Sequence, residues 1–269
     1  MTEADTYQRV HTALQTLKFI SVVDRLDALA QQAAAEHWTY LDFLDRLTQA
    51  ELAARTARDV TRNTRRARLP FVKTLDQFDF AFQPSVNEQQ LRDLATLRFV
   101  AHGENVLLLG PPGVGKTHLA VSLGMAALLN GQTVVFYTVA DLLDQLAQDA
   151  KTDRLQTRLK ALCGPEVLIL DEMGYFPLDK RAAQFLFQLV SRRYLKGSII
   201  LTSNKSYGDW GSIFSDTVLA TAILDRLLHA STTINIRGQS YRLHEKRHSG
   251  VLLDLPGSSA HKESSPDQP

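Results

Sequence analysis

The chain has 269 residues, of which 44% are apolar and 22% are charged, and its formal net charge is +1. This length allows one sizeable α/β domain and a smaller second unit. The single cysteine, Cys163, excludes an intrachain disulfide and a zinc site built on cysteines. The first residues lack a basic start followed by an apolar run, and no segment approaches the roughly 18 apolar residues that cross a bilayer. We therefore expect a cytoplasmic protein without a membrane partner.

Residues 1–69 are expected to form a small all-helical domain. Positions 1–66 contain neither Gly nor Pro, and large apolar residues recur there at helical spacing, for example Trp38, Leu41, Leu44 and Leu47. Thr39 stands three residues before Asp42, a spacing typical of a capping box at a helix start. Pro70 ends this pattern, and we interpret residues 70–104 as a linker and the entry to a second domain.

Residues 105–248 are expected to form an α/β domain. Strands are predicted at NVLLLG, TVVFYTV, EVLILDE, SIILTSN and TTINIRG, with helical patterns between them. Such continuous apolar runs are typical of strands covered on both faces, so we predict a mostly parallel sheet. Residues 249–269 are polar and rich in Ser and Pro, and we expect them to be disordered.

The stretch GPPGVGKT matches the complete P-loop pattern between a predicted strand and a predicted helix. Backbone amides of such a loop bind phosphate oxygens at a helix N-terminus. We expect Lys116 to reach the β and γ phosphates of ATP, and the Thr117 hydroxyl to bind Mg²⁺. The nucleotide-binding residues predicted in this segment are Gly110, Pro111, Pro112, Gly113, Val114, Gly115, Lys116, Thr117 and His118.

Two further strand ends carry polar residues. Asp171 and Glu172 follow VLIL, where an Asp can hold Mg²⁺ and a Glu can polarise a water for attack on the γ phosphate. A kinase for small molecules does not need the second carboxylate, because its substrate is the nucleophile, so the pair favours ATP hydrolysis. Asn204 ends the next buried strand, where its amide can contact the γ phosphate or the attacking water, or simply form a turn.

Arg226 interrupts the apolar face of a predicted helix far beyond the P-loop. Its guanidinium can pair locally with Asp225, or it can project toward a γ phosphate bound by the next subunit. A positioned arginine of the second kind raises the rate of phosphoryl transfer by roughly 10³–10⁵. Periodicity by itself favours the local pairing.

Five segments together resemble the IstB-like helper ATPases of bacterial insertion sequences, which are relatives of the DnaC-type helicase loaders in the AAA+ superfamily. The segments are GPPGVGKTHLA, VLILDEMGYFPLD, IILTSN, ATAILDRLLH and IRGQSYRLHEK. The first two occur in many ATPases, whereas the last two are more particular to this group. The resemblance covers the chain up to about Arg247, and it implies an AAA+ core with the strand order 5-1-4-3-2.

The resemblance also implies roles for single residues. Arg226 matches the arginine finger, which would complete the active site of a neighbouring subunit. Lys116 and Thr117 match the Walker A positions, Asp171 and Glu172 the Walker B pair, and Asn204 the sensor-I position. The predicted catalytic residues are Lys116, Glu172, Asn204 and Arg226, and the predicted metal ligands are Thr117 and Asp171. Arg242 matches a second arginine near the nucleotide. Phe78 and Phe80 lie in a linker that the family places beside the nucleotide, where they can contact the base or belong to the core, and Phe80 is the predicted base contact.

Basic residues gather in two segments. Arg55, Arg58, Arg62, Arg65 and Arg66 advance in steps of three and four, so most lie along one helix side that can follow a DNA backbone without sequence preference. A solvated helix face and a docking site for a partner protein are the alternatives. The second group is Lys151, Arg154, Arg158 and Lys160, at a position where related AAA+ proteins make pore-lining contacts to DNA. Helix solubility is the alternative for this group. The predicted DNA-binding residues are Arg62, Arg65, Arg66, Arg68, Lys151, Arg154 and Arg158.

The resemblance implies a homo-oligomer that forms on double-stranded DNA when ATP is bound and captures target DNA for the transposase of the same insertion sequence. We expect an ATPase that DNA stimulates, that bends the duplex, and whose hydrolysis governs assembly and disassembly. One alternative is a DnaC-type loader of a replicative helicase, with the same chemistry and a different protein partner. Another is a nucleotide-gated DNA-binding module in which ATP holds the assembly together and turnover is incidental.

Overall fold

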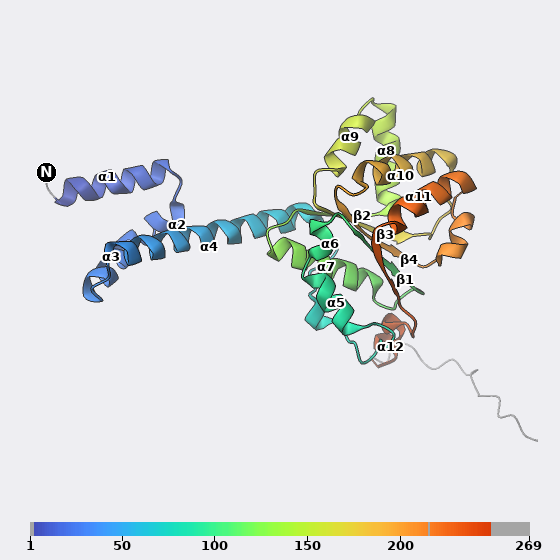
Figure 1. The fold of residues 1–269 in the computed structure, drawn as a ribbon, viewed down its shortest axis with the longest axis horizontal. Coiled ribbons are helices and arrows are strands. Elements are labelled where there is room, and N and C mark those ends of the chain that lie inside the picture. Colours follow the sequence, from blue (N-terminus) through green and yellow to red (C-terminus); the bar gives the residue numbers. More distant parts are fainter. Residues whose placement is uncertain (1–2, 215, 249–269) are drawn as a thin grey trace, which may run out of the picture.

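The computed structural model describes residues 3–214 and 216–248, which form a helical N-terminal part and an α/β core (Figure 1). The N-terminal part consists of α1 (Glu3–Thr16), α2 (Ile20–Val23), α3 (Leu26–Ala35) and α4 (Tyr40–Ala67). In Figure 1 the first three helices lie at the far end of α4, away from the core. The predicted tail, residues 249–269, lies outside the described residues.

Helix α4 is a rod of 28 residues that connects the N-terminal helices to the core. The predicted capping box begins it: the Asp42 amide donates to the Thr39 hydroxyl, and the Asp42 carboxylate accepts from the Thr39 amide, both at 3.2 Å. The helix ends at Ala67, before Pro70, because Arg68 adopts a left-handed conformation with φ of 57°. The Arg68 guanidinium donates to the Tyr137 hydroxyl at 3.2 Å and thereby attaches this end of α4 to the core.

The N-terminal helices pack around a small apolar cluster of Val22, Leu26 and Leu47. Beside it lies Glu51, which is only 3% exposed. Its carboxylate accepts hydrogen bonds from three donors, namely the Ser21 amide and the guanidinium groups of Arg55 and Arg58, at 2.9–3.1 Å. A buried charge requires such partners. The two arginines compensate the charge from within α4, and the Ser21 amide joins α2 to α4.

The core contains a five-stranded parallel sheet with the order β2-β3-β4-β1-β5. This is the predicted order 5-1-4-3-2 read from the opposite edge, so the prediction is confirmed. The strands are β1 (Asn105–Leu109), β2 (Val134–Thr138), β3 (Val167–Met173), β4 (Ser198–Ser203) and β5 (Ser231–Asn235). Every residue of β1 and β4 is buried, which explains the continuous apolar runs in the sequence.

Helices cover both faces of the sheet. Successive side chains of a strand point to opposite sides, so one strand can contribute to both apolar layers. In β3, Val167 and Ile169 belong to the apolar layer that includes α7, whereas Leu168 and Leu170 belong to the layer that includes α8 and α10. The core helices after β1 are α7 (Lys116–Leu129), α8 (Val139–Lys151), α9 (Leu155–Leu162), α10 (Lys180–Arg193), α11 (Thr217–Leu228) and α12 (Tyr241–His248). A 3₁₀ helix, η2 (Tyr207–Ser212), precedes α11.

The segment interpreted as a linker, residues 70–104, contains regular structure. It forms η1 (Leu75–Gln77), α5 (Glu88–Ala95) and α6 (Arg98–Ala101). Leu91 and Phe99 are buried in the same apolar layer as α7. This segment therefore packs against the sheet domain as well as leading into it.

Arg193, at the end of α10, is a charged residue inside the core and is 1% exposed. Its guanidinium donates to four backbone carbonyls at 2.8–3.1 Å, those of Leu162, Pro165, Glu166 and Ser198. Burial lowers the pKa of this guanidinium to about 10. The side chain thus joins the end of α9, the start of β3 and the start of β4.

Replacing Arg193 with methionine should lower the free energy of unfolding by about 3–5 kcal/mol, because four buried carbonyls lose their donor. Urea denaturation of the protein without nucleotide measures this change. The matched control is Arg192→Met, which removes a neighbouring guanidinium that bonds only the Gln156 side chain and should cost less than about 1 kcal/mol. Equal losses in the two variants would contradict the role assigned to Arg193.

Candidate functional site

The P-loop joins β1 to α7 and requires glycine at two positions. Gly113 and Gly115 have φ angles of 84° and 97°, a region that side chains disfavour. A Cβ atom at Gly113 would lie 2.1 Å from the Ser240 hydroxyl, and one at Gly115 would lie 2.6 Å from the Phe78 ring. The loop can therefore close tightly between α12 and the segment before α5, with its amides at the N-terminus of α7.

Lys116 lies inside this loop and is 6% exposed. Its ammonium donates to the carbonyls of Gly110 and Pro111 at 2.8 and 2.7 Å. Burial lowers the pKa of Lys116 to about 8, against the opposing effect of the Asp171 carboxylate. An anion bound in the loop would favour the charged form of this lysine.

Asp171, at the end of β3, is 4% exposed and connects three elements. Both of its carboxylate oxygens accept from the Thr117 hydroxyl at 3.0 Å, and one also accepts from the Thr202 hydroxyl at 2.5 Å. The two predicted metal ligands, Thr117 and Asp171, therefore lie side by side. Mg²⁺ is commonly held by one or two protein oxygens together with phosphate oxygens and water, and this pair provides such a set.

No group of three or more His, Cys, Asp or Glu residues that could hold a metal ion occurs within residues 3–214 and 216–248.

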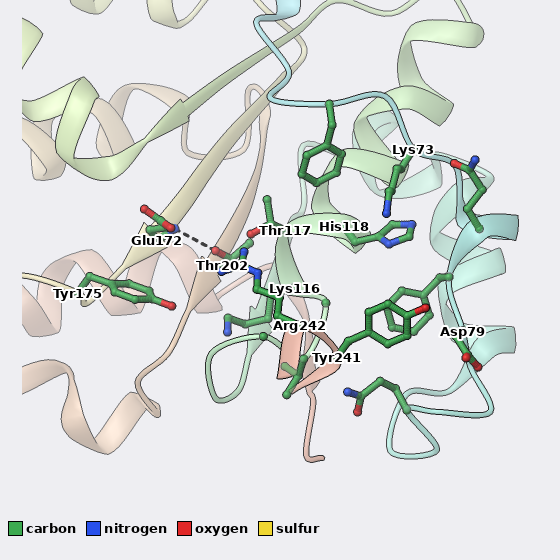
Figure 2. Close-up of a pocket in the computed structure, with 17 residues that line it drawn as sticks. Lys73, Asp79, Lys116, Thr117, His118, Glu172, Tyr175, Thr202, Tyr241 and Arg242 are labelled. Carbon is green, nitrogen blue, oxygen red and sulfur yellow. Dashed lines mark hydrogen bonds between the residues drawn. The ribbon is translucent and has the colours of Figure 1, made fainter. Parts of the chain in front are cut away.

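These residues surround one cavity of about 290 Å³ (Figure 2). Figure 2 shows Lys116, Thr117, Thr202 and Glu172 at one end of it and Lys73, His118 and Asp79 at the other. The wall is formed by Phe71, Lys73, Gln77, Phe78, Asp79, Gln83, Gly113, Val114, Gly115, Lys116, Thr117, His118, Glu172, Tyr175, Thr202, Tyr241 and Arg242. The P-loop residues thus lie toward one end of the cavity, and the segment before α5 lines the other.

Most of the predicted nucleotide-binding residues meet in this cavity. Gly110 and Pro111 contribute through the carbonyls that hold Lys116, and Pro112 lies exposed in the same loop. Arg242 reaches the wall from the first turn of α12, close enough for its charge to lower the pKa of Lys116 further. Phe80 is not part of the wall. Its ring packs edge-on against Phe78, which lines the cavity in its place.

Two of the predicted catalytic residues lie outside the cavity wall. Asn204 follows β4, and its side-chain oxygen is buried without a hydrogen-bond partner among the described residues. Arg226, on α11, donates to the Ala222 carbonyl at 2.9 Å, and its guanidinium lies 4.8 Å from the centre of the Phe187 ring. None of the ion pairs in the described part of the chain joins Arg226 to Asp225.

Several wall residues were not predicted from the sequence. Lys73, Gln77 and Asp79 come from the segment before α5, and Tyr241 comes from α12. Gln83 is 2% exposed and donates to the Gln239 carbonyl at 2.9 Å, which ties these two segments together. The aromatic run in FVKTLDQFDF was the available signal for this wall, whereas nothing in the sequence marks Gln83.

The predicted DNA-binding arginines differ in their contacts. Arg65 and Arg66 are exposed and line a shallow groove on α4 together with Arg58 and Arg62. Arg62 pairs with Asp59 at 2.8 Å on the surface, and Arg68 is held by the core.

The second basic group lies at the end of α8 and the start of α9. Lys151 and Arg154 are exposed there. Arg158 pairs with Asp149 at 2.7 Å, and this hydrogen bond raises the pKa of its guanidinium. The structure therefore leaves Lys151 and Arg154 more accessible than Arg158.

Among the described residues, no helix has both the length and the apolar character needed to cross a bilayer.

Comparison with known proteins identifies a matching family. The family described as IstB-like ATP binding protein matches residues 12–249. A protein named as the ATP-binding protein of insertion sequence IS5376, from Geobacillus stearothermophilus, is 47% identical over 89% of this chain and 96% of its own length. The corresponding protein of insertion sequence IS21, from Pseudomonas aeruginosa, is 50% identical over 89% of this chain and 90% of its own length.

Solved structures share the fold of the core. The AMPPCP-bound DnaA from Aquifex aeolicus has a TM-score of 0.55 at 18% identity, covering 70% of this chain and 59% of its own. The structure of DnaI has a TM-score of 0.51 at 21% identity, covering 62% of this chain and 89% of its own. The core is therefore an AAA+ fold.

Phe78→Ala should weaken ATP binding about tenfold, because an aromatic ring stacked on a base contributes roughly 1–3 kcal/mol. Phe80→Ala should change the dissociation constant less than about threefold, since that ring packs on Phe78 and not on the cavity. Titration with a fluorescent ATP analogue measures both constants. A larger loss for Phe80 than for Phe78 would show that the base lies elsewhere.

Proposed function

The chain belongs to the family of IstB-like ATP-binding proteins, and we propose that it assembles on duplex DNA as a homo-oligomer and delivers that DNA to the transposase of its insertion sequence. In this proposal the assembly bends the duplex, DNA stimulates ATP hydrolysis, and hydrolysis governs assembly and disassembly. The observation that carries the proposal is the division of the catalytic residues. One chain brings the P-loop and Glu172 to one cavity, whereas Arg226 lies outside it.

The proposed hydrolysis uses the residues of this cavity directly. A water oxygen attacks the γ phosphorus, the bond to the β–γ bridging oxygen breaks, and the Glu172 carboxylate accepts the water proton, which leaves ADP and phosphate. Lys116 and the P-loop amides hold the phosphates. Mg²⁺ at Thr117 and Asp171 would neutralise charge on the phosphate oxygens.

The proposed partner in this reaction is a second copy of the chain. Charge that develops on the γ phosphoryl oxygens is stabilised by a guanidinium. The Arg226 side chain is half-buried on α11. Its guanidinium donates to the Ala222 carbonyl of the same helix and lies over the Phe187 ring. A neighbouring subunit that packs its cavity against α11 would supply the γ phosphate to this arginine.

The proposed DNA surface is the groove on α4. Arg62, Arg65 and Arg66 are exposed along it, and such a row contacts phosphates without reading bases. Arg55 and Arg58 lie on the same helix but are bonded to Glu51. Lys151 and Arg154 form a second proposed contact. The relatives that are named for insertion sequences, at 47% and 50% identity, favour a transposition helper over a helicase loader.

Mixing two inactive variants tests whether Arg226 acts on a neighbour. Arg226→Ala and Glu172→Gln should each bind ATP normally and each lose DNA-stimulated hydrolysis. In an equal mixture, about one interface in four would combine an intact Glu172 with an intact Arg226 from the other variant. Phosphate release should then recover to about a quarter of the wild-type rate.

The control for this experiment is Arg181→Ala, because Arg181 also lies over a phenylalanine ring, that of Phe185, and has no proposed role. It should retain the wild-type rate. A mixture that stays inactive would show that Arg226 does not complete a neighbouring site. Delivery of DNA to the transposase by Glu172→Gln at the wild-type level would favour the nucleotide-gated module, in which turnover is incidental.

The salt dependence of binding tests the surface on α4. Changing Arg62, Arg65 and Arg66 to alanine should reduce the slope of log K against log salt concentration by about 2 to 3, since each phosphate contact contributes about 0.9. Duplex affinity at several salt concentrations gives the slope. Changing the exposed cations Lys180, Arg181 and Lys196 removes the same charge and should leave it unaltered. Equal changes in both sets would contradict a local DNA contact.

A further inference from the structure

Asp171 and Glu172 pose a geometric problem, because they are neighbours on one strand. Successive side chains of a regular strand point to opposite faces of the sheet. Here Asp171 contacts Thr117 of the P-loop helix, and Glu172 lines the same nucleotide cavity. The backbone must therefore depart from regular strand geometry at this point.

The departure is a bulge in β3. Leu170 pairs with Leu201 of β4, and the next pairing joins Met173 to Ser203. Two residues of β3, Asp171 and Glu172, thus stand opposite the single residue Thr202. Glu172 absorbs the extra length with a φ of 66°. A left-handed conformation is unfavourable at a residue with a side chain, so other contacts must hold it.

The Thr202 hydroxyl makes two contacts at the bulge, and the side chain is 1% exposed. The hydroxyl donates to the Asp171 carboxylate at 2.5 Å and accepts from the Glu172 amide at 3.0 Å. One oxygen atom therefore fixes the carboxylate of the first residue and the backbone of the second. Figure 2 shows Thr202 between Thr117 and Glu172, with the bond to Glu172 drawn as a dashed line.

We propose that Thr202 is a positioning residue for ATP hydrolysis, which holds the bulge so that the Glu172 carboxylate faces the γ phosphate while Asp171 remains on Thr117. This proposal rests on the hydrolytic function proposed above. Thr202 acts through its two neighbours and takes no proton itself. A base displaced by about 1 Å from its position can slow a reaction about 100-fold, so the hydroxyl affects turnover more than binding.

A second contact keeps β3 paired with β4 beside the bulge when the Thr202 hydroxyl is removed. The Ser203 hydroxyl donates to the Met173 carbonyl at 2.8 Å, on the far side of the bulge. The pairing of β3 with β4 on both sides therefore survives a change at Thr202. For this reason the expected result is a fall in kcat and not a loss of the fold.

The test compares Thr202→Val, which has nearly the same shape without the hydroxyl, with Thr202→Ser, which keeps the hydroxyl. The valine variant should lower kcat about 100-fold, with the dissociation constant for ATP within about threefold of wild type. The serine variant should stay within about threefold of the wild-type kcat. Thr202→Ala also lacks the hydroxyl, and it replaces the valine variant in this comparison if valine does not fold.

The matched control is Thr232→Val, the same change on β5 at a position opposite Val106 and outside the cavity wall. It should leave kcat and ATP binding unchanged. A wild-type kcat for Thr202→Val, or an equal loss of kcat for valine and serine, would overturn the proposal. Two further measurements separate this failure from that of the function itself. No ATP hydrolysis by the wild-type protein with duplex DNA would contradict the hydrolytic function, and a wild-type rate for Glu172→Gln would contradict the role of Glu172 as base, in both cases regardless of Thr202.

Discussion

The carboxylate of Asp171 is the contact on which the arrangement of the site depends. It accepts hydrogen bonds from Thr117 in the first turn of α7 and from Thr202 in β4, so it links the P-loop helix to two strands. These elements meet because the carboxyl ends of parallel strands lie at one edge of the sheet. The strand order places β1 beside β4 and β4 beside β3. The P-loop and Glu172 are thereby held in the wall of the same cavity.

The second constraint is that this cavity does not contain Arg226. The guanidinium lies on α11 against Phe187, so in a single chain the P-loop and Glu172, the proposed base, line the cavity without the arginine. In the proposed assembly each subunit receives this group from its neighbour, and DNA promotes hydrolysis by bringing subunits together. A short segment connects the proposed DNA surface on α4 to the cavity: α4 ends at Ala67, and Phe71 and Lys73 line the cavity.

Local sequence patterns predicted much of this structure and site. The P-loop, the acidic pair and the capping box at Thr39 are local, because their residues are close in the sequence and their chemistry follows from their spacing. The resemblance to a known family supplied the strand order. The bulge at Glu172 was not predictable, since it arises from pairing with a strand about thirty residues later. The choice of Phe78 over Phe80 as a wall residue likewise depends on packing against His118.

The basic residues show the same limit. Spacing places Arg55, Arg58 and Arg62 on one side of α4. Glu51 binds the first two within the same helix, and only the fold reveals that this glutamate is buried. Arg193 carries no sequence signal at all, because its four carbonyl partners come from three separate segments. Charge patterns therefore identified the helix that carries the proposed DNA surface, and tertiary contacts decide which of its arginines remain available to phosphate.

The most direct measurement is a structure, by electron cryomicroscopy, of the full chain with a nonhydrolysable ATP analogue, Mg²⁺ and duplex DNA. We expect neighbouring subunits in which the Arg226 guanidinium of one lies within hydrogen-bonding distance of the γ phosphate held by the other. An assembly in which every Arg226 still lies on Phe187 of its own chain, away from any nucleotide, would contradict this expectation.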